Sequence, residues 1–406
     1  MTESRVAITG LGLMTSLGLD LETTWTNLLA GTNTVRPFRL FDPEGVRSPF
    51  GFELPEGAAD IFSKFIKPRQ RKQMTRATMI ACTTAEMAIL DAGLKNVELE
   101  STRVGVVAGA TGTGYAPLTT ETDRHRILRN MASAPAAWIS LKGKWRGPSF
   151  TVSTACSSGA YALHSAYSLL QTGECDIVIA GAADSAINFL DIEGFCSLLA
   201  LSEDTENMLT ASRPFDKERS GFVMGEGGGM MVVESLSHAR KRGAKIRALL
   251  SKPGLCSEAY NIISPEPEGK SIARAMELAL KNAGLSPDDI DYINAHGTST
   301  PHNDLYETQA IKRVFGKAAW NVPISSTKSM TGHCLSAAAG VEAVICVKAL
   351  EDGHIPPTIN YNTPDPELDL DYVPNFSRAK PLNHVMSNSF AFGGQNGVII
   401  LSKHER

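Results

Sequence analysis

One pattern occurs twice in the chain: a β-type segment, a turn of small and polar residues, and a helix-type segment. The first copy contains Ser153-Thr-Ala-Cys-Ser-Ser-Gly-Ala160 and the second contains Ser326-Thr-Lys-Ser-Met-Thr-Gly-His333. Another pair of segments matches in the same way, Val106 to Thr113 and Tyr292 to Ser299. Because strand-type and helix-type segments alternate around both copies, the sequence predicts an α/β architecture with largely parallel strands. The repeat predicts a duplication in which equivalent strand ends meet near one pseudo-two-fold axis.

The duplication predicts that three reactive side chains share one site. Cys156 lies where a strand-type segment turns into a helix-type segment, and His296 and His333 lie in the matching turns of the second half. The N–H groups and the dipole at the start of a helix favour a thiolate, the nucleophilic form of cysteine. Taken alone, Cys156 could equally be a buried, inert cysteine, and each histidine could have an ordinary structural role. The matching turns favour the shared site.

Composition excludes several classes of function. The chain has 406 residues, is 43% hydrophobic and has a formal net charge of -4, which fits a globular protein with no reason to bind nucleic acid. No apolar run is long enough to span a membrane, and the N-terminus has no secretory signal. The seven cysteines are widely spaced without Cys-x-x-Cys pairs, which indicates free thiols in the cytoplasm and no metal site. Gly10 and Gly12 lack the third glycine of a dinucleotide-binding fingerprint.

Two clusters of basic residues precede the cysteine turn. Most charge runs are simply solvated, and a docking surface for an acidic partner is the sharper interpretation. The residues concerned are Lys64, Lys67, Arg69, Arg71 and Lys72 in the first cluster, and Arg124, Arg126 and Arg129 in the second.

Four motifs occur in an order that is typical of one enzyme family. They are Thr154-Ala-Cys-Ser-Ser-Gly159, His296-Gly-Thr-Ser-Thr-Pro301, Thr327-Lys-Ser-Met-Thr-Gly-His333 and Asn388-Ser-Phe-Ala-Phe-Gly-Gly394. With them, the whole chain resembles the β-ketoacyl-acyl carrier protein synthases of the elongating, type-II-like class and the related polyketide ketosynthases of the thiolase superfamily. The resemblance implies a thiolase-like duplicated α/β fold, a five-layered α-β-α-β-α sandwich, with ketosynthase halves at residues 1–246 and 247–406.

The resemblance also implies a reaction, and the residue types fit it. A thiolate can take an acyl group from a thioester, and two neutral imidazoles can donate hydrogen bonds to the enolate that forms when a malonyl thioester loses carbon dioxide. The implied enzyme is an acyltransferase of class EC 2.3.1 that joins an acyl thioester to malonyl-acyl carrier protein by decarboxylative Claisen condensation, in fatty acid or polyketide chain elongation. Cys156 is expected to be acylated, His296 and His333 to promote decarboxylation, and Lys328 to support His333.

Further roles are implied by position in the resembling motifs. The expected assignments are an oxyanion hole and gate at Phe392 and Ala391, pantetheine binding at Thr298 and Thr300, an acyl pocket at Gly112 and Phe195, and a buried structural carboxylate at Glu342. The implied partner is an acyl carrier protein, docked on the basic clusters, and the chain is expected to form a homodimer or a heterodimer with a ketosynthase-like subunit. No cofactor is expected beyond the phosphopantetheine that carries the substrates.

The residues of the site distinguish this prediction from other enzymes and from a non-catalytic role. Initiating condensing enzymes and thiolases resemble Cys-His-Asn or Cys-His-Cys sets, whereas the third residue here is His333. A cysteine hydrolase is chemically possible, but no motif resembles one. Non-catalytic chain-length subunits typically lack the cysteine, although this chain could be the ketosynthase subunit of a specialised polyketide heterodimer that needs such a partner.

Several positions differ from the pattern of the housekeeping enzymes. The segment Ser257-Glu-Ala-Tyr-Asn-Ile-Ile263 stands where those enzymes usually carry a histidine and a threonine. Ala391 replaces a usual glycine, and Gln395 replaces a usual threonine. Gly112 replaces a branched aliphatic residue, which predicts a longer acyl tunnel. These differences favour a specialised synthase.

Overall fold

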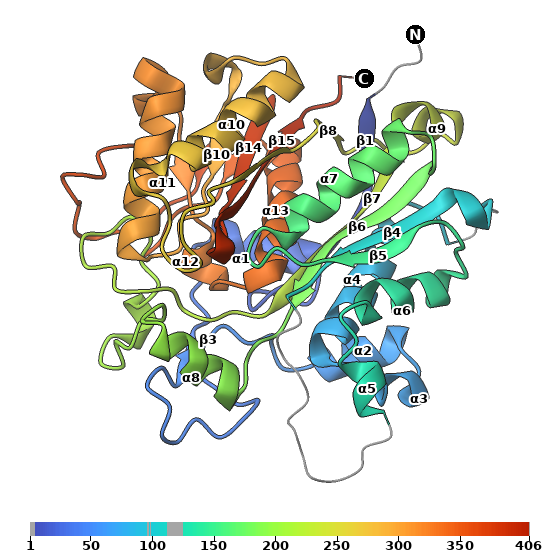
Figure 1. Cartoon of the computed structure of the whole chain (residues 1–406), viewed down its shortest axis with the longest axis horizontal. Helices are drawn as coiled ribbons and strands as arrows, with labels where there is room; N and C mark the ends of the chain where they lie inside the picture. The colour runs from blue at the N-terminus through green and yellow to red at the C-terminus, as the bar shows by residue number, and fades with distance from the viewer. Residues whose placement is uncertain (1–4, 96, 98, 112–124, 406) are drawn as a thin grey trace.

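The computed structural model describes residues 5–95, 97, 99–111 and 125–405, and its strands fall into two similar halves (Figure 1). The first half contains β1 (Val6–Met14), β7 (Gly227–Ser235), β6 (Ile177–Asp184), β4 (Val104–Gly109) and β5 (Ser149–Val152). The second contains β8 (Ala248–Leu250), β15 (Gln395–Ser402), β14 (His384–Ser389), β10 (Tyr292–Asn294) and β11 (Ile324–Ser325).

The two halves repeat one pairing scheme. Strand β4 is parallel to β5 and β6, just as β10 is parallel to β11 and β14. The next pairs, β6–β7 and β14–β15, are antiparallel. Antiparallel pairing of β1 with β8 joins the halves, so the order is β11-β10-β14-β15-β8-β1-β7-β6-β4-β5. The predicted duplication is therefore confirmed at the level of strand topology. The expectation of largely parallel strands is wrong, because β7, β1, β8 and β15 pair with their neighbours in antiparallel fashion and make the sheet mixed.

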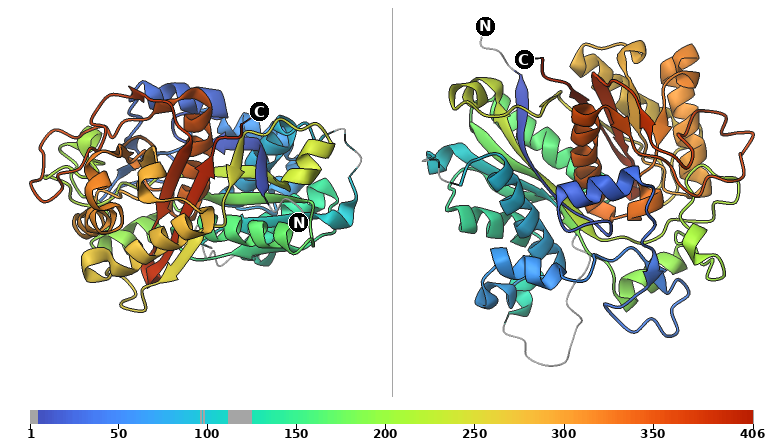
Figure 2. Two further views of the ribbon diagram at one scale, coloured as in Figure 1. Left: turned by 90° about the horizontal axis from the view of Figure 1, so that it is seen from above. Right: turned by 180° about the vertical axis from the view of Figure 1, so that it is seen from behind.

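Helices cover both faces of each half and complete five layers. The central layer contains α7 (Ser158–Gln171) and α13 (Ala338–Asp352), which contact strands of both halves. Helices α4 (Arg76–Asp91) and α6 (Ala134–Gly143) cover the outer face of the first half. Helices α10 (Lys270–Ala283) and α11 (Pro301–Phe315) cover that of the second, as Figures 1 and 2 show. The expected α-β-α-β-α sandwich is confirmed.

The packing of the layers follows from the residues that form them. Helix α13 is buried from Ala338 to Leu350, as its mostly small and apolar sequence on every side requires. Strand β1 is buried along its whole length. A Cβ atom at Gly12 would lie 1.9 Å from the carbonyl oxygen of Thr84 in α4. Gly12 therefore lets α4 approach β1 closely. This close packing accounts for the glycine without a nucleotide-binding loop.

Smaller elements lie around this framework. They are α1 (Leu21–Leu29), β2 (Arg36–Pro37), β3 (Phe50–Gly51), α2 (Ala58–Phe65), α3 (Pro68–Arg71), α5 (Arg126–Arg129), α8 (Phe189–Ser197), α9 (Leu236–Lys241), β9 (Gly254–Ser257), α12 (Lys328–Thr331), β12 (His354–Ile355) and β13 (Arg378–Ala379). Among the described residues, no helix has both the length and the apolar character needed to cross a bilayer. The division into domains at residues 246 and 247 stays a prediction.

Candidate active site

Cys156 lies in a tight turn between β5 and α7. Ala155 has a φ of 46°, in the left-handed region, and the turn is closed by the backbone N–H of Ser157, which donates to the carbonyl of Thr154 at 3.2 Å. The hydroxyl of Ser158 donates to the carbonyl of Ala155 at 2.7 Å and accepts from the N–H of Thr154 at 2.9 Å. The turn holds the cysteine side chain at the start of the central helix, where only 6% of Cys156 is exposed.

The structure brings the cysteine and both histidines together. The Nε2 atom of His333 lies 3.1 Å from the Sγ atom of Cys156. The rings of His296 and His333 meet edge to face, with centroids 5.4 Å apart and an interplanar angle of 85°. One sulfur and two imidazole nitrogens thus lie within 4.8 Å of one another.

Burial dominates the ionisation of Cys156. It raises the pKa of the thiol to about 12, although the charge of Lys328 and the backbone N–H groups of Phe392 and of Cys156 itself all act to lower the pKa. The expectation that the helix start favours the thiolate is therefore outweighed by desolvation in the free protein. The backbone N–H groups of Phe392 and Cys156 therefore lie on the side of the thiol and favour negative charge there.

Both histidines are held in the neutral form. Burial, reinforced by the positive charge of Lys328, holds the pKa of His296 and of His333 well below the ordinary value. The Nδ1 atom of each ring has no hydrogen-bond partner among the described residues. A neutral imidazole carries one N–H, so each ring can donate a single hydrogen bond without bringing a charge.

The positive charge near the two histidines belongs to Lys328, which forms a buried ion pair. The Nζ atom of Lys328, in α12, donates to a carboxylate oxygen of Glu342 in α13, and each side chain is 2% exposed. Burial raises the pKa of Glu342 to about 7, although the ammonium group favours the carboxylate. The Cys156, His296 and His333 atoms could in principle ligate a metal ion, but the charge of Lys328, felt by both imidazoles, opposes a cation there.

Two polar residues that the sequence analysis gave no role support His296. Glu307 in α11 accepts hydrogen bonds from the backbone N–H groups of His296 at 2.9 Å and Gly297 at 2.8 Å. Asn388 at the end of β14 donates to Glu307 at 2.9 Å. Burial raises the pKa of Glu307 to about 7. The available signal was a glutamate on the same helical face as the apolar Ile311.

The proposed gate lies in the loop that joins β14 to β15. The ring of Phe392 stacks on that of Phe195 from α8, with centroids 6.4 Å apart and planes at 22°. Gly393 and Gly394 adopt φ values of 81° and 71°, which favour glycine. Ala391 has a φ of -132°, so its side chain causes no backbone strain.

A cavity of about 480 Å³ leads from Cys156 toward solvent. The hydroxyl oxygens of Thr298 and Thr300 lie 2.8 Å apart on its wall. Ile263 and Ala391 also line it. The expected pantetheine-binding and gate residues therefore border one channel that ends at the three reactive side chains.

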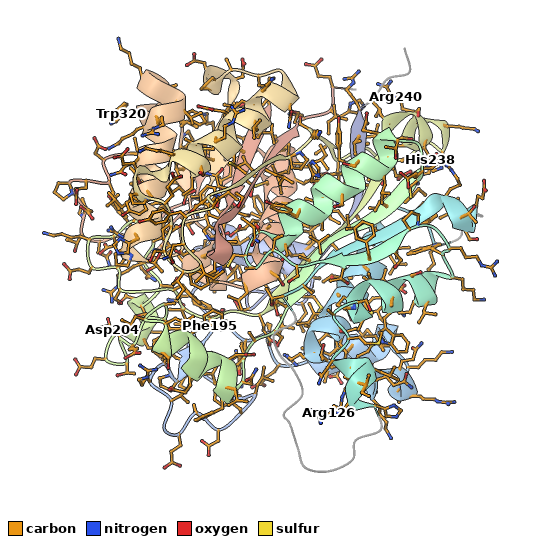
Figure 3. All side chains as sticks on the ribbon, in the orientation of Figure 1. Arg126, Phe195, Asp204, His238, Arg240 and Trp320 are labelled. Carbon is orange, nitrogen blue, oxygen red and sulfur yellow. The ribbon has the colours of Figure 1, made fainter. Side chains whose placement is uncertain are left out.

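Other expected site residues lie elsewhere or outside the described residues. Gly112 and Arg124 belong to the latter group. Lys64, Lys67, Arg69 and Lys72 are exposed on and beside α2 and α3, and Arg71 donates to the hydroxyl of Ser63 at 2.7 Å. Arg126 and Arg129 are half-buried on α5, and Arg126 lies apart from Phe195 in Figure 3.

Family models match both halves of the chain. "Beta-ketoacyl synthase, N-terminal domain" matches residues 3–239, and "Beta-ketoacyl synthase, C-terminal domain" matches residues 248–362. The chain is 41% identical to a 3-oxoacyl-[acyl-carrier-protein] synthase 2 from Synechocystis, over 100% of this chain and 99% of that protein. It is 38% identical to the enzyme of the same name from Staphylococcus aureus, over 99% of each chain.

Solved ketosynthase structures are also similar to the whole chain. The ishigamide ketosynthase/chain length factor matches with a TM-score of 0.91 and 34% identity over 99% of each chain. A β-ketoacyl synthase from Burkholderia phymatum matches with a TM-score of 0.91 and 33% identity, over 99% of this chain and 100% of that one. A type II polyketide ketosynthase in complex with its acyl carrier protein and bound to a hexaketide matches with a TM-score of 0.88 and 33% identity, over 99% of each chain.

Proposed function

The chain belongs to the β-ketoacyl synthase family, and we propose that Cys156, His296 and His333 carry out its chemistry. It is an acyltransferase that catalyses decarboxylative Claisen condensation of an acyl thioester with malonyl-acyl carrier protein, in fatty acid or polyketide chain elongation. The product is a β-ketoacyl-acyl carrier protein. The observation that carries the residue assignment is the 3.1 Å approach of the His333 Nε2 atom to the Cys156 sulfur, with the second imidazole beside it.

The first step transfers the acyl group to Cys156. The sulfur attacks the thioester carbonyl, a new carbon–sulfur bond forms, and the bond to the carrier's thiol breaks, so that this thiol leaves with a proton. The N–H groups of Cys156 and Phe392 stabilise the oxyanion of the tetrahedral intermediate. They offset part of the cost of ionising a buried sulfur, and Lys328 adds to this effect.

The second step forms the carbon–carbon bond. His296 and His333 donate N–H hydrogen bonds to the thioester oxygen of the malonyl group while its carboxylate leaves as carbon dioxide. The resulting enolate attacks the carbonyl of the acyl-cysteine, and the Cys156 sulfur leaves. Neutral donors suit this step because an N–H that is already in place needs no proton to be supplied from solvent. The low pKa of both rings keeps this form available at neutral pH.

We assign positioning roles to the residues behind the imidazoles. Lys328 places its positive charge near the developing enolate, Glu342 holds the Lys328 ammonium group in position, and Glu307 holds the backbone of His296. Thr298 and Thr300 face the channel, where their hydroxyl groups suit the amides of a pantetheine arm. These are roles in binding and positioning.

The proposed gate and acyl pocket are built around Phe392. Phe392 and Ala391 are assigned to the gate between the channel and the acyl pocket. Phe195, whose ring stacks on that of Phe392, is assigned to the acyl pocket. Gly112 lies outside the described residues and is proposed to belong to that pocket. Replacing Gly112 with isoleucine is expected to shorten the longest product in a reconstituted elongation assay.

The basic residues are proposed to dock the carrier protein. Complementary charges raise association rates and are screened by salt. The double variant Lys67→Glu and Arg71→Glu is expected to raise the KM for carrier-borne substrates by about tenfold at low salt. An equal increase for a pantetheine thioester that lacks the carrier would contradict this assignment.

Intact-mass analysis tests the proposed function directly. The protein is incubated with a panel of acyl-acyl carrier proteins, and a mass increase equal to the acyl group is expected on Cys156. The Cys156→Ala variant is the control and is expected to gain no mass. Acylation of this control, or no acylation of the wild type by any member of the panel, would refute the assignment.

A second candidate is the ketosynthase subunit of a specialised polyketide heterodimer. The likeness to the ishigamide ketosynthase/chain length factor and the presence of Ile263 in the wall of the channel favour it. Native mass spectrometry separates it from a homodimer, because the mass of the assembly shows whether the chain pairs with a copy of itself. A heterodimer subunit also requires its partner for condensation. In either case we propose a cytoplasmic enzyme with no cofactor other than the carrier's phosphopantetheine.

A further inference from the structure

A buried carboxylate outside the proposed chemistry lies at the end of β6. Asp184 is the last residue of this strand and is 2% exposed. Its Oδ2 atom accepts hydrogen bonds from the hydroxyl groups of Thr111 and Ser336, at 2.6 Å each, and from the backbone N–H of Ser336 at 3.2 Å. Its Oδ1 atom accepts from the backbone N–H of Ser185 at 2.9 Å. Hydroxyl groups donate at such short distances to an ionised carboxylate. We call Asp184, Thr111 and Ser336 the Asp184 cluster.

The Asp184 cluster joins three segments of the fold. Asp184 ends β6, Thr111 follows β4, and Ser336 lies in the turn Leu335–Ala337 that leads into α13. The first N–H groups of a helix have no partner within the helix, and a negative charge near them is favourable. Asp184 supplies both an acceptor and a charge at this end of the central helix. The cluster therefore fastens the start of α13 to the sheet of the first half.

Leu335, next to Ser336, forms part of the wall of the reaction site. It is 3% exposed and lines the cavity that contains Cys156. It also belongs to an apolar cluster against which the rings of Phe195 and Phe392 pack. The φ of Leu335 is 47°, in the left-handed region that residues with a Cβ atom rarely adopt. Such a conformation costs free energy and persists only where neighbouring contacts hold it.

The turn that contains Leu335 is held on both sides. On one side, the N–H of His333 donates to the carbonyl of Val223 at 2.8 Å, and the carbonyl of His333 accepts from the N–H of Gly225 at 3.0 Å. On the other side, Ser336 is held by its two hydrogen bonds to the buried carboxylate. Release of Ser336 would therefore let the backbone relax and shift Leu335 along the wall of the cavity.

The charge of Asp184 also acts on Cys156. Burial is the main cause of the raised pKa of the Cys156 thiol, Lys328 acts to lower this pKa, and Asp184 acts to raise it. The carboxylate thus disfavours the thiolate, while its hydrogen bonds hold the wall of the cavity. Because the two effects on the reaction have opposite signs, a variant that removes the charge can separate them.

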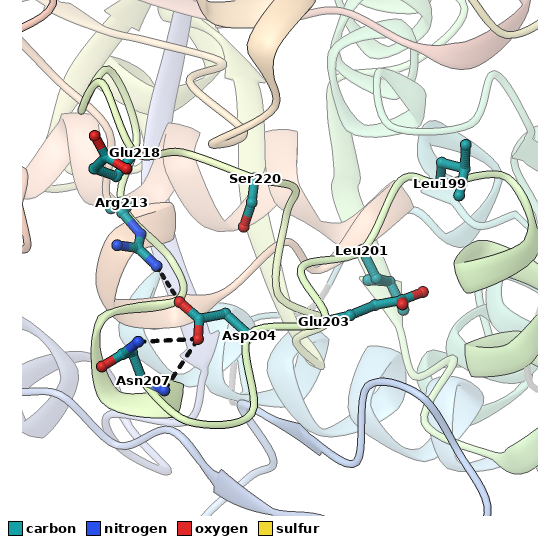
Figure 4. Close-up of a pocket in the computed structure, with 8 residues that line it drawn as sticks. All are labelled: Leu199, Leu201, Glu203, Asp204, Asn207, Arg213, Glu218 and Ser220. Carbon is teal, nitrogen blue, oxygen red and sulfur yellow. Dashed lines mark hydrogen bonds and ion pairs between the residues drawn. The ribbon is translucent and has the colours of Figure 1, made fainter.

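The carboxylates beside the channel have a different setting. A second cavity, of about 510 Å³, shares part of its lining with the channel and contains Glu203 and Asp204 (Figure 4). Asp204 pairs with the guanidinium group of Arg213 and accepts two hydrogen bonds from Asn207, at 3.1 Å each. The side chains of Glu203 and Asp204 are 41% and 23% exposed. Solvent reaches these groups, whereas Asp184 is held by hydrogen bonds inside the protein.

We propose that Asp184 is a positioning residue for condensation, which holds Leu335 beside Cys156. The hydrogen bonds from Ser336 and Thr111 to its carboxylate transmit this restraint. The inference rests on the proposed function, in which Cys156 carries the acyl chain while the enolate attacks it. The attack requires the acyl carbonyl and the enolate to be held in a narrow range of geometry. Leu335 restricts where the acyl chain can lie, so its displacement should slow the attack more than it weakens the binding of either substrate.

The Asp184→Asn variant tests the proposal. Its kcat for condensation, expressed per acylated Cys156 as counted by intact mass, is expected to fall about tenfold because charge-assisted hydrogen bonds are lost. The KM for malonyl-acyl carrier protein should change little. Alkylation of Cys156 by iodoacetamide, followed by peptide mass, should instead become faster by about twofold or more, because the opposing charge is gone. A loss of folded protein would leave kcat per acylated site unchanged and would expose the buried Cys82 to the reagent.

Two matched comparisons separate hydrogen bonding from charge and from general destabilisation. Thr111→Val removes a hydroxyl group at nearly constant shape and should lower kcat by about threefold without faster alkylation, whereas Thr111→Ser keeps the hydroxyl group and should retain kcat. Glu53→Gln is the control for removal of a buried carboxylate. Glu53 is 2% exposed and accepts from the N–H groups of Arg39 and Leu40 at 2.9 Å each, but lines neither cavity. This variant should change neither kcat nor alkylation.

Each other result has a distinct meaning. An unchanged kcat per acylated site in Asp184→Asn would overturn the proposal, as would an equal fall in Glu53→Gln or the same fall in Thr111→Ser as in Thr111→Val. Alkylation of Cys156 that stays at the wild-type rate, or that is accompanied by alkylation of Cys82, would give Asp184 a purely structural role and would also overturn it. Failure of the proposed function is distinct, because the wild type would then form no acyl-Cys156 with any carrier protein.

Discussion

The turns that meet at the active site have similar local construction, but one is uncharged and the other carries a buried lysine. In the first half, the turn before α7 contains only small uncharged residues around Cys156, and its contribution is a sulfur and a backbone N–H group. In the second half, the segment after β11 holds Lys328 and His333, both almost completely buried. Duplication therefore supplied two equivalent positions, and the chemistry at each position became different.

The central helices differ in the same sense. Helix α7 has no acidic residue, lysine or arginine, whereas the equally central α13 places Glu342 in the interior. A buried carboxylate is expensive unless it is paired, and Lys328 provides the partner. The turn and helix that hold Cys156 carry no acidic residue, lysine or arginine, whereas Lys328 of the second half supplies the positive charge that acts to lower the pKa of the thiol. Asp184 of the first half acts in the opposite direction.

Removal of the nucleophile should have the largest effect on this division of roles. Cys156→Ala is expected to abolish condensation, because no other residue in the site can hold the acyl chain covalently. Malonyl decarboxylation should survive, since its donors come from the other half. Measurement of carbon dioxide release and of condensation product tests both statements. Residual condensation in this variant would show that the halves do not divide the chemistry in this way.

Removal of either imidazole should produce the next largest effect. His296→Ala or His333→Ala is expected to reduce malonyl decarboxylation by about a hundredfold or more, the usual effect of losing one oxyanion donor. Acylation of Cys156, measured by intact mass, should remain detectable. Poor acylation with normal decarboxylation would mean that the second half serves the first step instead.

The charged and uncharged turns should differ in their contributions to stability. Glu342→Gln leaves Lys328 without its counter-charge, and loss of one member of a buried pair costs about 3–5 kcal/mol of the free energy of unfolding. Ser158→Ala in the uncharged turn removes neutral hydrogen bonds and should cost about 1–2 kcal/mol. Denaturant unfolding of both variants measures the difference. Equal losses would contradict the contrast between the turns.

The pH dependence of decarboxylation should be the smallest effect. Both imidazoles must be neutral to act as proposed, and a base is neutral above its pKa. Because burial lowers the pKa of both rings well below the ordinary value, protonation of the imidazoles should reduce the rate only below about pH 6. Any change between about pH 6 and about pH 8 is expected to come from Glu307 and Glu342, whose pKa values burial raises to about 7. A fall near the ordinary histidine pKa that persists in the Glu342→Gln variant would show that the imidazoles are less shielded than their burial implies.

The sequence predicted the parts of the site that depend on local chemistry. The change from strand to helix at Cys156 follows from the small residues around it, and the duplication follows from the matched segments. The sequence did not predict Glu307, because its role depends on α11 packing against the end of β10. It also overstated the influence of the helix start on Cys156, because burial is not visible in a turn sequence.

The sequence by itself determined the order of the motifs, the alternation of strands and helices and the choice of candidate reactive side chains. The tertiary structure alone decided that His333 lies 3.1 Å from the sulfur, that Lys328 is buried against Glu342, and that Asp184 accepts hydrogen bonds from Thr111 and Ser336. The physical reason is the distance along the chain over which each effect acts. Turn and helix preferences act over a few neighbouring residues, whereas desolvation and the meeting of distant strand ends depend on how the whole chain packs.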